Sequence, residues 1–474
     1  MQITFHGATG EVTGSCFLLD TGRHRVLIEC GMMQGGRNER SRNAAKFPFD
    51  VRDIDAVIVT HGHIDHIGRL PLLVKRGYKG PIHAQRATAE LARVMLEDAA
   101  SLAISDTERR NRAHQRRGQR TETPLYDLDD VADTLKLLVG HEYDRKVEVL
   151  PDLVLRLRDA GHILGAASLE MWVGEGEQVR KIVVSGDIGP RGTPILRDPQ
   201  PIQDADMVLL ESTYGDRLHR PRADTVAEMG DIFRQAAAEK GKVLIPAFAV
   251  GRSQEILWWL AEHFDDWGLK PWRIFLDSPM ALRVVELYNR HTGLFGPQAR
   301  ERWQGEGNPF RMSNLRMVSR NEDSMAINKL ASGVIVIAGS GMCNGGRILH
   351  HLRHNAWKEN THIIFSGYQA QGTLGRQLVN GEKFVTIYGE KIHIRAKVHT
   401  IGGLSAHADQ NGLAEWYGHF RAKPPVWLVH GEDKAREGLA ARLRDFHGAE
   451  VHLPAAGETV AVPSAREEVE ESGA

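Results

Sequence analysis

The chain has 474 residues, with 60 Lys or Arg, 61 Asp or Glu and a formal net charge of −1. This length predicts two domains, or one large domain with an insertion, and the 42% hydrophobic content is sufficient for well-packed cores. A near-neutral chain excludes any argument for nucleic-acid binding from global charge, so only local patches can support it.

Cysteine usage and hydropathy predict a soluble, cytoplasmic protein. The three cysteines, Cys16, Cys30 and Cys343, are too few for a disulfide framework and indicate a reducing compartment. The first residues, MQITFHGATG, have neither the basic nor the apolar region of a signal peptide. Since no apolar run approaches the roughly 18 residues of a membrane span, we expect no membrane partner.

The first half of the chain is predicted to be mainly β-structure around one helix. SCFLLD, RVLIEC and DAVIVT are short apolar or alternating runs bounded by Gly or Asp, which is typical of strands. Residues 88–120 have helical hydrophobic spacing and then become strongly basic. A second β-rich stretch extends from Val147 to about Asp187.

The basic run after this helical segment is a candidate surface for nucleic acid. It contains Arg109, Arg110, Arg112, Arg116, Arg117 and Arg120. A solvated helix face is the other interpretation of such a run. No aromatic residues interleave with the arginines, so stacking on bases is not supported there.

Strands and helices alternate from about residue 209 to residue 396. KVLIPAFAV, RIFLDSP, GVIVIAGSG and HIIFSG predict strands, whereas RSQEILWWLAEHF and GGRILHHLRHN predict helices. This alternation is typical of βαβ units on a parallel sheet, and we therefore predict an α/β insertion. The acidic tail SAREEVEESGA, which includes residues 464–474, is predicted to be disordered.

The segment THGHIDHIG, residues 60–68, is the strongest chemical motif, because it places His61, His63, Asp65 and His66 directly after an apolar strand. Side chains two positions apart can converge on one ion, and the next pair can face a second. His162 and Asp187 each follow a β-run beside a glycine, where the backbone can turn, and His430 ends another strand. Imidazole and carboxylate ligands suit zinc, with manganese as the main alternative. Taken singly, each is equally a polar turn residue.

Together these motifs resemble the metallo-β-lactamase-fold nucleases with a β-CASP insertion, especially the bacterial and archaeal relatives of the endonuclease subunit of the pre-mRNA 3′-end cleavage complex. The resemblance extends from GATGEVTGSC to LVHGE and includes GHILGAAS, SGDIG, LLESTYG and SAHAD. It implies an α/β fold, with an αββα metallo-β-lactamase sandwich and an inserted α/β β-CASP domain. The implied boundaries are 1–208 and 397–463 for the sandwich and 209–396 for the insertion.

The resemblance also implies roles for individual residues. His61, His63 and His162 would bind one zinc ion, Asp65, His66 and His430 a second, and Asp187 would bridge the two. Glu29 stands where the family usually has Asp, and its role is left open.

The implied reaction is hydrolysis of phosphodiester bonds in single-stranded RNA by a metal-bridging hydroxide. The implied catalytic residues are Asp65, His407, which would protonate the leaving oxygen, and Glu211, which would orient that histidine. The expected products have 3′-hydroxyl and 5′-phosphate ends. Endonuclease action, additional 5′–3′ exonuclease action and assembly as a homodimer are left open.

Two glycine-rich loops, GSGMCNGGR and GYQAQGTLGR, follow apolar strands and offer N–H groups, hydroxyls and arginines that can contact phosphates. With the PAFAVGRSQE motif they give the candidate substrate-binding residues Arg252, Ser340, Arg347, Gln371, Thr373 and Arg376. A structural turn is the other interpretation for each loop residue. For Arg252 the alternative is an ion pair with Glu255 at the start of a helix.

Three alternative functions use similar metal motifs. A small-molecule ester or thioester hydrolase needs neither the insertion motifs nor the Glu211–His407 pair. DNA repair nucleases of the superfamily tend to lack the last histidine, which is present here as His430. A non-enzymatic scaffold would have lost metal ligands. The sequence therefore favours the ribonuclease.

Overall fold

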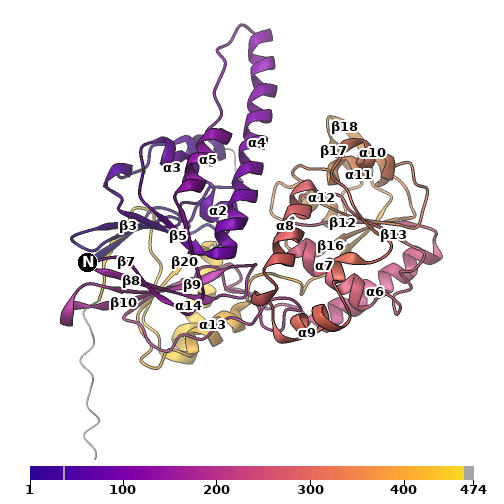
Figure 1. Ribbon diagram of the computed structural model, residues 1–474. Helices are drawn as coiled ribbons and strands as arrows, with labels where there is room; N and C mark the ends of the chain where they lie inside the picture. The colour runs from indigo at the N-terminus through magenta and orange to yellow at the C-terminus, as the bar shows by residue number, and fades with distance from the viewer. Residues whose placement is uncertain (36–37, 464–474) are drawn as a thin grey trace, which may run out of the picture. The chain divides into compact units, whose positions relative to one another are not determined.

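The computed structural model describes residues 1–35 and 38–463, and the predicted disordered tail, 464–474, lies outside the described residues (Figure 1). Contacts divide the chain into two compact units. The first contains residues 1–191, 198–218 and those from 407 onward, and the second contains residues 192–197 and 219–406. This division places residues 209–218 in the first unit and 397–406 in the second, whereas the sequence-based boundaries, which remain predictions, assign them the other way round.

The first unit is built on two seven-stranded sheets. One has the order β22–β1–β2–β3–β4–β5–β6, with β1 (Gln2–Phe5), β2 (Phe17–Asp20), β3 (Arg25–Ile28), β4 (Ala56–Ile58), β5 (Ile82–Gln85), β6 (Leu138–His141) and β22 (Thr459–Ala461). The other has the order β21–β20–β11–β10–β9–β8–β7, with β7 (Lys146–Leu150), β8 (Leu153–Asp159), β9 (Ala167–Val173), β10 (Arg180–Val184), β11 (Met207–Glu211), β20 (Val426–Val429) and β21 (Val451–His452).

The two sheets share one core. Strand β8 shows why: Leu153, Leu155 and Leu157 are fully buried while the intervening residues are partly exposed, as period-two alternation requires. These leucines pack in the same cluster as Ile3 and Phe5 of β1. The apolar face of each sheet is therefore buried against the other.

Helices cover the face of the first sheet that points away from the second sheet. These are α2 (Ile64–Ile67), α3 (Leu70–Lys75), α4 (Arg86–Arg116) and α5 (Leu128–Lys136), and α1 (Glu39–Ala44) precedes them in the chain. A capping box of Asp127 and Asp130 begins α5, and Leu72 and Leu96 are buried in one cluster with Val57 of the sheet. Helix α14 (Asp433–His447) packs on β20 and β21 of the second sheet and on α13 (Gln410–Gly418). This αββα layering confirms the predicted fold class.

The second unit contains a six-stranded sheet in which every neighbouring pair is parallel, as predicted. Its order is β14–β13–β15–β12–β16–β19, with β12 (Lys242–Pro246), β13 (Arg273–Leu276), β14 (Leu315–Met317), β15 (Val334–Ala338), β16 (Thr361–Phe365) and β19 (Lys397–Thr400). The central strands are continuous apolar runs, which suits a sheet buried on both faces.

The connections of this sheet are helical. They are α6 (Arg222–Ala238), α7 (Arg252–Glu262), α8 (Pro279–Arg290), α9 (Pro297–Gly305), α10 (Asn321–Ile327), α11 (Ile348–Asn355) and α12 (Leu374–Val379). A hairpin of β17 (Phe384–Ile387) and β18 (Glu390–His393) follows. Over the described parts of both units, no helix is long and apolar enough to cross a membrane.

Candidate metal centre

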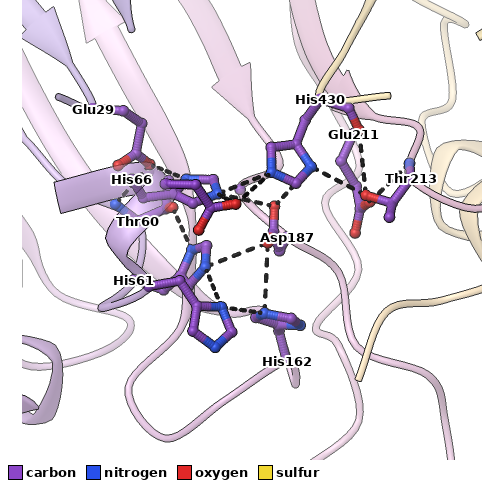
Figure 2. A network of polar contacts seen from close by, with 12 residues as sticks. Glu29, Thr60, His61, His66, His162, Asp187, Glu211, Thr213 and His430 are labelled. Atoms are coloured by element: carbon purple, nitrogen blue, oxygen red, sulfur yellow. Dashed lines mark hydrogen bonds and ion pairs between the residues drawn. The ribbon is translucent and has the colours of Figure 1, made fainter. Parts of the chain in front are cut away.

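The metal motifs meet at the strand ends of the first unit. β10, β11 and β20 are parallel neighbours, so the residues that follow them lie at one edge of the sheet. Asp187 follows β10, Glu211 ends β11 and His430 follows β20. The turn before Asp187 is made by Gly186 at φ +58°, where an added Cβ would lie 2.8 Å from the carbonyl oxygen of Ala167. Figure 2 shows the side chains of Asp187, Glu211 and His430 pointing toward one another.

One group of ligand atoms is formed by His61, His63, His162 and Asp187. Nδ1 of His63 lies 3.1 Å from Nε2 of both His61 and His162. Oδ2 of Asp187 lies 3.3 Å from Nε2 of His61 and 3.5 Å from Nε2 of His162. Ligand atoms about 2.0–2.1 Å from a tetrahedral zinc ion are about 3.3 Å apart. The donor types and their spacing therefore fit zinc.

A second group contains Asp65, His66 and His430. Nε2 of His66 lies 3.2 Å from Nε2 of His430, and Oδ2 of Asp65 lies 3.5 Å from that same atom of His430. Oδ1 of Asp187 lies 3.5 Å from Nε2 of His66 and has no hydrogen-bond partner among the described residues, although Asp187 is only 2% exposed. Each oxygen of Asp187 thus faces a different group, as a bridging carboxylate requires.

Side chains behind the ligands fix the orientation of the imidazole rings. Nδ1 of His61 lies 3.0 Å from Oγ1 of Thr60, and Nδ1 of His430 lies 3.0 Å from Oγ1 of Thr213. Nδ1 of His66 faces Oε1 of Glu29 at 3.5 Å, and that oxygen accepts a hydrogen bond from the backbone N–H of Thr60. The sequence prediction missed both threonines, because a threonine beside a motif carries no signal of its own.

Glu211 and His407 form a pair beside the ligands. Nδ1 of His407 lies 3.1 Å from Oε1 of Glu211, which also accepts from the backbone N–H of Ile188 at 2.7 Å. The other oxygen, Oε2, accepts from the hydroxyl of Thr213 at 2.5 Å. The buried carboxylate therefore connects His407 to Thr213 and, through it, to the candidate ligand His430.

Burial and mutual charge control the protonation of the ligands. Burial lowers the pKa of His61 to about 3 and that of His63 to about 4, which keeps these rings in the neutral form that binds metals. Burial raises the pKa of Asp187, but the surrounding histidines outweigh this effect and hold it well below its usual range. For His407 burial lowers the pKa, and the charges of Glu211 and Asp187 raise it to about 9.

The predicted phosphate contacts lie in the second unit, and two of the arginines are paired with carboxylates of the same unit. Arg347 donates to Oδ1 of Asp277 at 2.7 Å and also to three further oxygens, those of Val318, Ser319 and Asn321. Arg252 is only 8% exposed and pairs with Glu255. The ion pair left open from the sequence is therefore present.

The two glycine-rich loops of the second unit lie side by side, since Gly375 N donates to Met342 O at 3.1 Å. Three of the four predicted contacts in these loops make hydrogen bonds within their own loop or helix. Oγ of Ser340 accepts a hydrogen bond from the backbone N–H of Asn344, the side chain of Thr373 caps α12, and Arg376 donates to the carbonyl oxygen of Gln369. The fourth, Gln371, is exposed. Phe248 and Tyr368, which the sequence prediction did not include, follow β12 and β16 and are 48% and 41% exposed. The substrate-binding roles remain predictions.

Comparison with known proteins places this geometry in a family. Residues 9–156 match the model of the metallo-beta-lactamase superfamily, residues 253–378 the Beta-Casp domain and residues 391–454 the Zn-dependent metallo-hydrolase RNA specificity domain. The fold and the ligand set therefore define a metal-dependent hydrolase. More specifically, the chain belongs to the β-CASP family of the metallo-β-lactamase superfamily.

The chain is 42% identical to Ribonuclease TTHA0252 of Thermus thermophilus, over 98% of this chain and 100% of that protein. It is 30% identical to the transcription termination factor FttA of Methanocaldococcus jannaschii, over 96% of this chain and 70% of that protein. A crystal structure of a protein of unknown function from Enterococcus faecalis V583 has a similar fold, with a TM-score of 0.52 at 12% identity and coverage of 97% and 99% of the two chains.

Proposed function

We propose that this protein is a zinc-dependent ribonuclease that hydrolyses phosphodiester bonds of single-stranded RNA. The observation that carries the proposal is the position of Asp187, with one oxygen toward each group of ligand atoms, next to the Glu211–His407 pair. The match to an RNA specificity domain and the 42% identity to a protein named as a ribonuclease support RNA as the substrate.

The chain would hold two zinc ions, with Asp187 as the shared ligand. His61, His63 and His162 would bind one ion, and Asp65, His66 and His430 the other. Such ions supply a water activated for attack near neutral pH and neutralise charge that builds up on the phosphate. Glu29 would orient His66 from behind, since its carboxylate faces Nδ1 of that ring.

His407 would act as the general acid. Its Nδ1 faces Glu211, and its Nε2 would give a proton to the leaving oxygen as the P–O bond breaks. Glu211 is a positioning residue in this scheme, because it holds the ring and does not touch the RNA. The products would carry 3′-hydroxyl and 5′-phosphate ends.

The second unit would contribute contacts to the RNA backbone through Ser340, Gln371, Thr373 and Arg376. Arg252 and Arg347 would act less directly, since Glu255 and Asp277 already occupy their guanidinium groups. Endonuclease action, with additional 5′–3′ exonuclease action, is the expected mode. A cytoplasmic location and a homodimer stay predictions, and light scattering would measure the homodimer directly.

The test is cleavage of 5′-labelled single-stranded RNA beside a DNA of matched sequence and a small thioester, with the zinc content measured. Asp65→Ala should lose activity and bound zinc, whereas His407→Ala should keep zinc and lose a factor of about 10²–10⁴ in rate. His452→Ala, on the edge strand β21 and with its side chain 41% exposed, is the matched control and should behave as wild type. Cleavage of the thioester or of DNA alone would contradict the proposal.

A further inference from the structure

Helix α4 extends far beyond the core of the first unit, as Figure 1 shows. Leu96 and Ala100 are its last residues in the core cluster, and Leu102 is already 62% exposed. After the helix ends at Arg116, the chain returns alongside it toward α5. We call residues 101–124 the arm.

Paired hydrogen bonds hold the returning segment against the helix. Nδ2 of Asn111 donates to the carbonyl oxygen of Glu122 at 2.9 Å, and the N–H of Glu122 donates to Oδ1 of Asn111 at 2.8 Å. Nearer the tip, Nδ1 of His114 lies 3.2 Å from the carbonyl oxygen of Arg120. The end of the helix and the turn after it are therefore one ordered element of the fold.

The arm is strongly basic, with six arginines against only Asp106, Glu108 and Glu122. Asp106 pairs with Arg109 at 3.0 Å, and Glu122 is paired by Arg40 and Arg110. The remaining arginines form what we call the tip: Arg112, Arg116, Arg117 and Arg120. All four are exposed, and within the described residues none lies within 4.0 Å of a carboxylate.

We propose that the tip binds the phosphate backbone of the RNA substrate at a distance from the metal centre. Guanidinium groups that are not paired with a carboxylate are well suited to phosphate oxygens. Within the tip, Nε of Arg116 donates to the carbonyl oxygen of Arg112 at 3.2 Å. The tip has no aromatic side chain for base stacking, so this binding would not depend on sequence. The inference rests on the proposed function, because it concerns the same RNA.

The length of α4 sets the distance. At its base Leu91 packs on the metal-binding run, since a Cβ added at Gly62 would lie 2.9 Å from Cδ2 of Leu91. Arg112 is 21 residues further along the same helix, which is about 31 Å at 1.5 Å per residue. A stacked strand covers about 3.4 Å per nucleotide, so the tip would contact phosphates about nine nucleotides from the cleaved bond. Short RNAs would not reach it.

The test uses the metal-loaded protein and a quadruple variant of the tip, R112Q/R116Q/R117Q/R120Q, which keeps good helix formers. The matching arginine-to-lysine variant preserves the charge and is the control. Binding of a hydrolysis-resistant phosphorothioate RNA of about 24 nucleotides is measured against salt concentration. Each lost phosphate contact reduces the magnitude of the slope of log K against log salt by about 0.7. The slope of the glutamine variant should therefore be smaller in magnitude by between about 2 and 3, and its affinity for the RNA should fall by about tenfold or more. The lysine variant should lose little.

Cleavage assays separate this inference from the proposed function. The glutamine variant should show a raised KM for the long RNA and an unchanged kcat/KM for an RNA of about six nucleotides. An unchanged slope, or an equal loss on both RNAs, would overturn the inference even if wild type cuts RNA. Loss of binding to anionic vesicles with RNA binding intact would also overturn it, in favour of a lipid surface. If wild type cuts no RNA but the glutamine variant still loses about 2 to 3 from the salt slope of RNA binding, the proposed function fails, and the tip is shown to bind RNA that is not a substrate.

Discussion

Replacing Thr213 with valine tests whether the hydroxyl behind His430 orients this ligand. Valine has nearly the same shape, so the substitution removes three contacts of the hydroxyl without leaving a large void. These are the contact with Nδ1 of His430 at 3.0 Å, the hydrogen bond donated to Oε2 of Glu211 at 2.5 Å and a longer contact with the carbonyl oxygen of His430 at 3.2 Å. Once they are lost, the His430 ring can turn away from its ligand position.

The expected loss of zinc affinity follows from the hydrogen bonds that remain after the substitution. Partners behind a metal ligand typically contribute 10–100-fold in metal affinity. The backbone N–H of Thr213 still donates to Oε2 of Glu211 at 3.2 Å, so that oxygen keeps one of its two donors, and the partners of Oε1 are unchanged. We therefore expect the lower part of that range, about 10–30-fold or about 1.4–2 kcal/mol.

Competition with a zinc-selective chelator measures this loss directly, with zinc content and circular dichroism recorded on the same samples. Thr213→Ser keeps the hydroxyl and is the matched control, which should hold zinc within about threefold of wild type. If Thr213→Val retains zinc as tightly as Thr213→Ser while both are folded, the hydroxyl does not orient His430 and the reasoning is refuted.

Three further perturbations have defined outcomes. Glu29→Gln should weaken zinc binding by about tenfold, since the carboxylate behind His66 is lost; equal chelator resistance would contradict this. Removing zinc should lower the Tm, because an ion that binds only the folded state stabilises it; calorimetry with and without chelator checks this. Burial raises the pKa of Asp277, but hydrogen bonds from His351, Ser324 and Arg347 outweigh the effect of burial, so the pKa is lower than its usual value. Asp277→Asn should therefore cost about 1–3 kcal/mol at pH 7 and less as pH falls below about 4, since this stabilisation requires the ionised carboxylate; a pH-independent loss in urea unfolding would refute it.

The clustering of the candidate metal ligands could be predicted from the sequence, because each lies in a short motif at the end of an apolar strand. Parallel strands such as β10, β11 and β20 then bring those ends together without any further information. The same logic predicted the parallel sheet of the second unit, whose strands are continuous apolar runs. Local sequence patterns were therefore sufficient to predict which residues lie together at the ends of parallel strands.

Contacts between distant residues could not be predicted in this way. Arg347 has the appearance of a phosphate-binding arginine until the fold brings Asp277, 70 positions earlier, against its guanidinium group. Thr213 supports a histidine 217 positions later. The arm was visible only as a helical pattern that turns basic, because the pattern does not show where the core ends.

The order of the ligands along the chain has a consequence for the cell that makes this protein. His407 and His430 follow the second unit, so the group of Asp65, His66 and His430 and the Glu211–His407 pair stay incomplete until translation has passed residue 430, whereas the other group of ligand atoms is complete at Asp187. Until then a nascent chain lacks the proposed proton donor and one proposed ligand of the second ion. With the proposed roles, the ribonuclease would become active only after nearly the whole chain has been synthesised.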